Sequence, residues 1–104
     1  MERFAWKARV LPGQLDEYIR RHDEIWPEMT ALLNEAGIHN YTIWSVGDEL
    51  FGYYECVSVA EAARIQGSSP VVDRWNAYMK DVMTMEFDPV TGSQLQLRQV
   101  FLHG

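Results

Sequence analysis

HNYTIWSVGDELFGYYECV, residues 39–57, predicts two β-strands joined by a tight turn. β-Branched and aromatic residues are frequent in both halves, 39–46 and 50–57, as is typical of strands. Gly47-Asp48 between the halves is a turn signal, so an antiparallel hairpin is expected. The elements that flank this hairpin then determine the fold class.

A strand and a kinked helix are expected before the hairpin. In residues 2–10, apolar residues alternate with basic ones, which is the period of a strand. Residues 15–26 place their apolar side chains on one helical face. Pro27 cannot continue that helix, but it suits the first turn of a second helix over 27–36.

A split helix and a last strand are expected after the hairpin. Ser58 opens a short helix with a capping box, and Ser69, which precedes a proline, opens a second helix whose apolar stripe continues to Val82. Residues 84–93 are expected to form a loop, because they contain proline and glycine. Residues 94–102 are expected to form the last strand.

The order β, kinked α, β, β, split α, β predicts an α+β fold, the ferredoxin-like split βαβ domain, for residues 1–104 as one domain. In that fold an antiparallel sheet carries helices on one face only. Many aromatic residues lie on the expected strands, and a monomer rarely exposes so many to solvent. They are Trp6, Tyr41, Trp44, Phe51, Tyr53, Tyr54 and Phe101. A homodimer that packs sheet on sheet, or nearly closes a barrel, is therefore expected; the alternative is a monomer with a half-solvated sheet.

Composition excludes several classes of partner. The 104 residues include 9 Lys and Arg against 15 Asp and Glu, a net charge of −6, which disfavours nucleic acid and anionic membrane surfaces. No apolar stretch is long enough to span a bilayer, and the N-terminus lacks a signal-peptide block, so a cytoplasmic protein is expected. Cys56, the single cysteine, cannot form an internal disulfide and is expected to be a small buried residue.

Tyr18 and His22 are the candidate catalytic pair. Four residues apart on a helix, they project side by side from the face that points toward the sheet. A partly desolvated histidine there can titrate near neutral pH and act as a proton donor or acceptor, with the phenol orienting it or binding substrate. The alternative is a packed histidine satisfied by Tyr18 or by a backbone group.

Other candidates lie on the last helix and on the second strand. Trp75 can stack on the C–H surface of a sugar, while Asn76 and Tyr78 can bond its hydroxyls; the alternative is plain core packing. Strand alternation is expected to send His39 and Tyr41 to the same face of the sheet. No pair among the three histidines has the spacing of a helical zinc site, so no metal is expected.

Several stretches of the chain resemble the L-rhamnose mutarotase family. They are RHDEIWPE (21–28), GIHNY (37–41), RW (74–75) with YM (78–79), DVM (81–83), and Leu97 with Val100-Phe101. The resemblance covers nearly the whole chain in the same order, and the His-x-x-Ile-Trp-Pro-Glu string is its most specific part.

The resemblance implies a dimeric α+β barrel that interconverts the anomers of L-rhamnose without a metal or organic cofactor. The family's proton-donating histidine falls on His22, and its sugar-binding tyrosines fall on Tyr18 and Tyr41. Its tryptophan pair falls on Trp75 and Asn76, so the second member is an amide here. This departure leaves the expected type of reaction unchanged, but it leaves the identity of the sugar undecided. L-Fucose or another 6-deoxy sugar, a monooxygenase-like activity, and a non-catalytic ligand-binding barrel are the alternatives.

Overall fold

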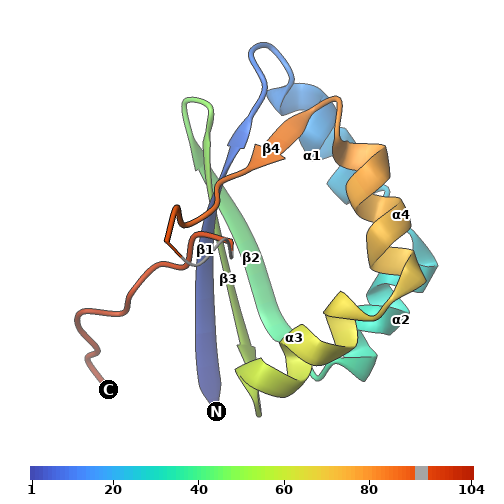
Figure 1. Ribbon diagram of the computed structural model, residues 1–104. Helices are drawn as coiled ribbons and strands as arrows, with labels where there is room; N and C mark the ends of the chain where they lie inside the picture. Colours follow the sequence, from blue (N-terminus) through green and yellow to red (C-terminus); the bar gives the residue numbers. More distant parts are fainter. Residues whose placement is uncertain (91–93) are drawn as a thin grey trace.

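A four-stranded antiparallel sheet carries helices on one of its faces, as Figure 1 shows. The computed structural model describes residues 1–90 and 94–104. The elements are β1 (Glu2–Val10), α1 (Leu15–Asp23), α2 (Pro27–Glu35), β2 (His39–Val46), β3 (Glu49–Cys56), α3 (Val59–Gly67), α4 (Pro70–Met79) and β4 (Met83–Met85). The sheet order is β2-β3-β1-β4. The expected α+β class and the central hairpin are thereby confirmed.

Proline and serine set the helix boundaries as expected, with one difference. α1 ends at Asp23, three residues before the expected end at Trp26. Trp26 is extended, with φ of −64° and ψ of 139°, because the residue before a proline avoids the helical region. Ser58 caps α3 by accepting the Glu61 N–H at 3.1 Å. The expected break between the first two helices is therefore confirmed, and Trp26 lies in the connection between α1 and α2.

The prediction of the last strand was wrong. β4 lies at Met83–Met85, where it overlaps the start of the stretch expected to be a loop, and pairs with the Ala8–Val10 end of β1. The chain leaves α4 directly onto this free edge, where the Leu11 N–H donates to the Val82 carbonyl at 2.9 Å. β4 thus occupies the Ala8–Val10 part of this edge, and residues 95–97 bond to the Ala5–Lys7 part. Gly92, part of the expected loop, lies outside the described residues.

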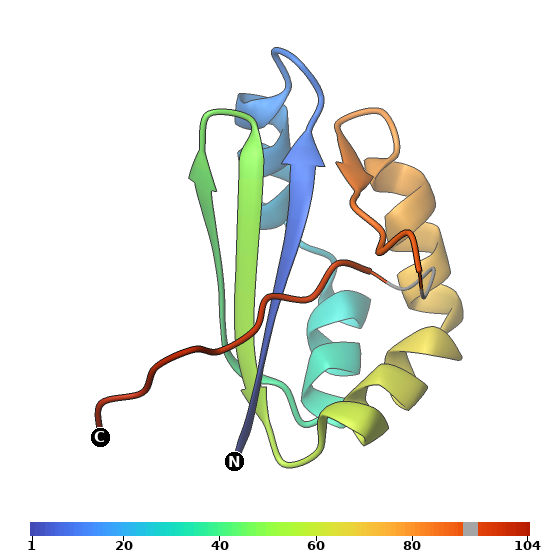
Figure 2. The same cartoon turned by 60° about the vertical axis from the view of Figure 1, so that its left-hand side comes forward.

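The C-terminal segment adds only a short contact to the sheet. The Leu97 N–H donates to the Ala5 carbonyl at 2.8 Å, and the Lys7 N–H donates to the Leu95 carbonyl at 3.2 Å. Beyond these bonds the chain forms no regular strand and crosses the sheet on the side away from the helices (Figure 2).

A β-bulge in β2 interrupts the alternation of side chains, so the expectation that His39 and Tyr41 share a face was wrong. Between His39 and Thr42, β2 contains one residue more than its partner strand, and Asn40 there has a positive φ of 50°. The extra residue turns Tyr41 toward the helices, where its ring lies 5.2 Å from that of Tyr54, while His39 stays exposed. Bulges redirect side chains in this way and are common near active sites.

The core lies between the sheet and the helices. Its buried side chains come from the two central strands, β1 and β3, and from all four helices, and Cys56 is fully buried among them, as expected. The opposite face of the sheet, here called the open face, carries Trp44, Val46, Phe51 and Tyr53, and Trp44 is 69% exposed. Among the described residues, no helix has both the length and the apolarity that a membrane span requires.

Candidate active site

Five aromatic side chains gather where the end of α1 meets α4. The His22 ring lies 4.2 Å from that of Tyr18 and 5.4 Å, edge-on, from that of Trp75. The Trp26 ring lies 5.0 Å from Trp75 and 5.3 Å from Tyr78. We call these five residues the His22 cluster. Tyr18 and Trp75 are its buried members, while His22 and Trp26 are half-buried and Tyr78 is partly exposed.

One nitrogen of His22 is fixed and the other is available. Nδ1 lies 3.0 Å from the Tyr18 carbonyl oxygen, and because a carbonyl only accepts, Nδ1 carries the proton in this bond. In neutral imidazole Nε2 is then the acceptor, and it has no hydrogen-bond partner among residues 1–90 and 94–104. No fully buried side-chain nitrogen or oxygen in these residues lacks a partner, so the unpaired Nε2 is not completely enclosed by the protein.

Burial controls the protonation of the site. It lowers the pKa of His22 below its ordinary value of 6.5, against smaller opposing effects of the bond to the Tyr18 carbonyl and of the Asp23 charge. Burial also raises the pKa of Tyr18, with a further contribution from the nearby Tyr41. At neutral pH the site therefore presents a neutral imidazole beside the neutral phenol of Tyr18.

Tyr41 reaches the same core from the sheet. Its hydroxyl accepts a hydrogen bond from Trp6 Nε1 at 3.0 Å. Trp6 stands opposite Gly52 in the neighbouring strand, and the absence of a side chain there lets the indole lie across β3 toward Tyr41 on β2. Burial is the main cause that raises the pKa of Tyr41, so this phenol also stays neutral.

The sequence-predicted site residues are only partly brought together. The His22 ring contacts those of Tyr18 and Trp75. Tyr41 packs against the hydrophobic core that contains Tyr18 and Trp75. Asn76 follows Trp75 on α4 but is exposed outside these contacts, so its binding of a sugar hydroxyl stays a prediction.

Sequence reasoning missed several residues of this region. Trp6 and Trp26 contact the predicted residues but were not expected in the site. Gly52 lies inside β3, beneath the Trp6 indole, and the sequence analysis gave it no role. A glycine within a strand pattern indicates a close approach of another group, so this signal was present in the sequence.

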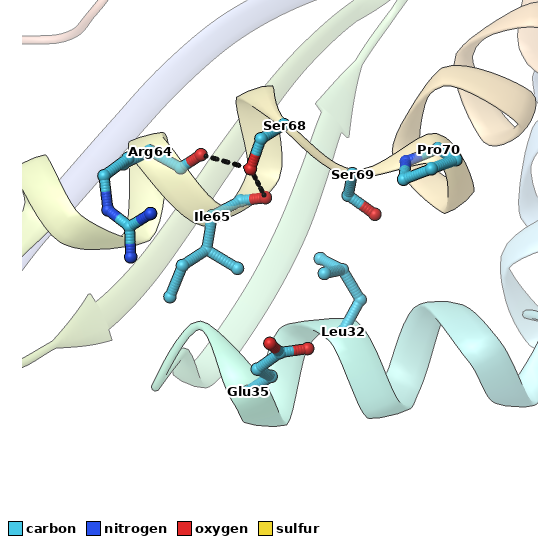
Figure 3. A pocket seen from close by; sticks show the side chains of 7 residues that line it. All are labelled: Leu32, Glu35, Arg64, Ile65, Ser68, Ser69 and Pro70. Atoms are coloured by element: carbon cyan, nitrogen blue, oxygen red, sulfur yellow. Dashed lines mark hydrogen bonds between the residues drawn. The ribbon is translucent and has the colours of Figure 1, made fainter.

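Two hollows lie on other parts of the molecule. A groove of about 320 Å³ between α2 and the junction of α3 with α4 contains Arg64, Ser68 and Ser69 (Figure 3). Its two serines are already bonded: the Ser68 hydroxyl donates to the Arg64 carbonyl at 3.0 Å, and the Ser69 hydroxyl caps α4. The second hollow lies between β1 and the C-terminal segment. Among the described residues, no three His, Cys, Asp or Glu side chains gather as metal ligands would.

Comparison with known proteins decides the family. A family model described as L-rhamnose mutarotase matches residues 3–103. The chain belongs to the L-rhamnose mutarotase family. An L-rhamnose mutarotase of Sinorhizobium fredii is 42% identical over 91 residues, which cover 85% of this chain and 86% of the relative.

Solved structures agree with this family. The crystal structure of an L-rhamnose mutarotase from Formosa agariphila superposes with a TM-score of 0.81 at 27% identity, over the whole of both chains. Tetracenomycin F2 cyclase from Streptomyces glaucescens, a type-II polyketide cyclase, also covers the whole chain, with a TM-score of 0.69 and 15% identity. At that identity the cyclase shows the shared fold alone. The L-rhamnose mutarotase family thus has the fold described above.

Proposed function

We propose that this protein is an isomerase that interconverts the α and β anomers of L-rhamnose, with His22 as its acid–base group. The relatives that bear this name support the reaction. One observation carries the role of His22: Nδ1 is held by a backbone carbonyl, while Nε2 has no partner among the described residues and is not fully buried. Aromatic faces and a few polar groups are what sugar sites commonly offer.

A single nitrogen can move the proton in both directions. Neutral Nε2 accepts the proton of the anomeric hydroxyl, and the C1–O1 bond becomes a carbonyl as the bond between C1 and the ring oxygen breaks. The imidazolium then donates that proton to the ring oxygen. Both oxygens are bonded to C1, so both lie within reach of one nitrogen. After rotation about the C1–C2 bond the steps reverse, and His22 recovers the proton on closure.

The remaining predicted residues bind the sugar in this proposal. Tyr18 holds the ring or anomeric oxygen, and Tyr41 binds a hydroxyl. Trp75 stacks on an apolar face of the sugar, and Asn76 contacts a hydroxyl. The amide of Asn76 leaves L-fucose or another 6-deoxy sugar as the alternative substrate.

Saturation-transfer NMR tests the activity and the substrate together. Irradiation of one anomeric proton of a sugar reduces the signal of the other only when the anomers exchange. We expect exchange faster than the uncatalysed reaction with L-rhamnose, and slower exchange with L-fucose and D-glucose. Fast exchange with L-fucose alone would show that L-fucose is the substrate in place of L-rhamnose. No acceleration with any aldose would contradict the proposal.

The exchange rate is expected to fall in acid. Because the lowered pKa of His22 lies below 6.5, neutral Nε2 is the main form at neutral pH and is lost as the pH falls through that pKa. Among the described residues, the charge of Asp23 opposes this lowering of the His22 pKa, and the phenols of Tyr18 and Tyr41 stay neutral throughout. Rates measured between about pH 5 and pH 8 should follow the NMR titration of the His22 ring. A rate that increases in acid would instead make the imidazolium the resting form.

We propose that the chain, as one domain of residues 1–104, works as a homodimer that covers the open face. Trp44 and Val46 are 69% and 61% exposed there, although the helix side of the same sheet is closely packed. Large apolar side chains gathered on one face favour association. A sheet-on-sheet contact would bury them.

Trp44→Glu is expected to separate the dimer into monomers, because a carboxylate would be buried in the contact. Sedimentation velocity would show the loss of the dimer, with circular dichroism to check the fold. Val90→Glu, at a position that is 91% exposed outside the sheet, is the control and should leave the dimer intact. If the unmodified protein sediments at its chain mass of 12.1 kDa, the homodimer is contradicted.

A further inference from the structure

Arg21 joins the two helices that carry the His22 cluster. It precedes His22 on α1, and its side chain reaches the end of α4. Nη1 donates to Asp81 Oδ1 at 2.8 Å and to the Tyr78 carbonyl at 2.7 Å, and Nη2 donates to Asp81 Oδ2 at 3.2 Å. Nε donates to Glu17 Oε2 at 2.7 Å. The guanidinium thus uses one edge for its own helix and the other for α4.

The surroundings of Arg21 hold it in a single geometry. Its side chain is only 11% exposed, although Asp81 is 71% exposed. The guanidinium carbon lies 4.4 Å from the centre of the Tyr78 ring, so the plane also stacks on an aromatic face. A planar fork with two-point bonds to a carboxylate fixes orientation better than a lysine ammonium can.

This link matters because the site has its walls on two different helices. Tyr18 and His22 lie on α1, and Trp75 and Tyr78 lie on α4. The rings of these walls touch one another in the structure, and a sugar that enters between them must replace some of those contacts. The polar bonds of Arg21 lie beside the rings and can persist while the rings part.

We propose that Arg21 is a positioning residue, whose bonds to Asp81 and to the Tyr78 carbonyl set the spacing between His22 and the wall formed by Trp75 and Tyr78. This inference rests on the proposed function, since the wall is defined by the sugar that it would bind. Misplacement of a reacting group by about 1 Å can cost about 10²-fold in rate, so a link of this kind affects turnover without touching the substrate.

Arg20 supplies a matched control. It is the preceding residue on the same helix, carries the same charge and shares Glu17 as a partner. The other partner of Arg20 is Glu24, four residues further along the chain. The Arg20 side chain is 53% exposed. Arg20→Met therefore removes an equal charge and an ion pair to Glu17 without removing a bond to α4.

The test compares Arg21→Met with Arg20→Met in two measurements. We expect Arg21→Met to lower kcat/KM for anomer exchange by about 10- to 100-fold, and Arg20→Met to change it by less than about twofold. Arg21→Lys should recover only part of the loss, because it restores the charge without the fork. The second measurement is the NMR shift of the His22 ring protons, which the edge-on Trp75 ring displaces in the native geometry. That shift should change in Arg21→Met and stay in Arg20→Met.

Asp81→Asn guards against a variant that simply fails to fold. The substituted carboxylate is exposed, and asparagine keeps its shape, so the same changes are expected at smaller size. Equal effects of Arg21→Met and Arg20→Met on both measurements would overturn the inference. If the unmodified protein does not exchange anomers, the proposed function fails, and the His22 ring shift still decides whether Arg21 sets the spacing.

Discussion

Replacement of His22 by alanine is expected to slow catalysed anomer exchange by about 10²- to 10⁴-fold, the usual contribution of one general acid–base group. The loss is large because burial raises the pKa of the Tyr18 and Tyr41 phenols, so neither can replace the imidazole as a base near neutral pH. Saturation-transfer NMR with L-rhamnose measures the change directly.

His39→Ala is the matched control for this experiment. His39 lies on β2 but is exposed on the open face, away from the cluster. Its replacement should leave the exchange rate unchanged. Full exchange by His22→Ala, with a normal unfolding transition, would show that the imidazole takes no part in the reaction.

Replacement of Gly52 by alanine is expected to lower the free energy of unfolding by about 3 kcal/mol, at the upper end of the usual cost of overpacking. A Cβ at this position would lie 2.0 Å from Trp6 Cε2 and 2.3 Å from Nε1. Trp6 is only 5% exposed and is bonded to Tyr41, so the indole has no free direction in which to move. Urea unfolding followed by tryptophan fluorescence would measure the loss.

The same substitution is expected to disturb Tyr41, because the displaced indole can no longer donate to its hydroxyl. Binding of the sugar should therefore weaken in the fraction that stays folded. Gly67→Ala is the control, since a Cβ there meets nothing within 4 Å and the backbone has no positive φ. Equal stability of Gly52→Ala and Gly67→Ala would show that the indole is not constrained as described.

Local patterns sufficed for the hairpin and for the helix starts. β2 spans the expected residues, and the serine and proline signals begin α3 and α4 where they were predicted. Each of these features depends on residues within a few positions of one another. The pairing of β1 with β4 does not, since its two strands lie far apart in the chain.

In the site, too, local features could be predicted and long-range ones could not. Tyr18 and His22 are neighbours on one helix, so the sequence places them together. The position of Tyr41 depends on a bulge at Asn40, and the alternation of an ideal strand would send it to the open face. The link from Arg21 to Asp81 spans 60 positions and has no local signal. Tertiary geometry decides these features.

Long-range 1H–15N NMR of histidine-labelled protein tests the central claim most directly, because it shows which nitrogen of His22 carries the proton. We predict a neutral ring with its proton on Nδ1, and a change in the Nε2 shift when L-rhamnose is added while Nδ1 stays as it is. A proton on Nε2 in the neutral ring, or an Nε2 signal that is indifferent to the sugar, would contradict the account.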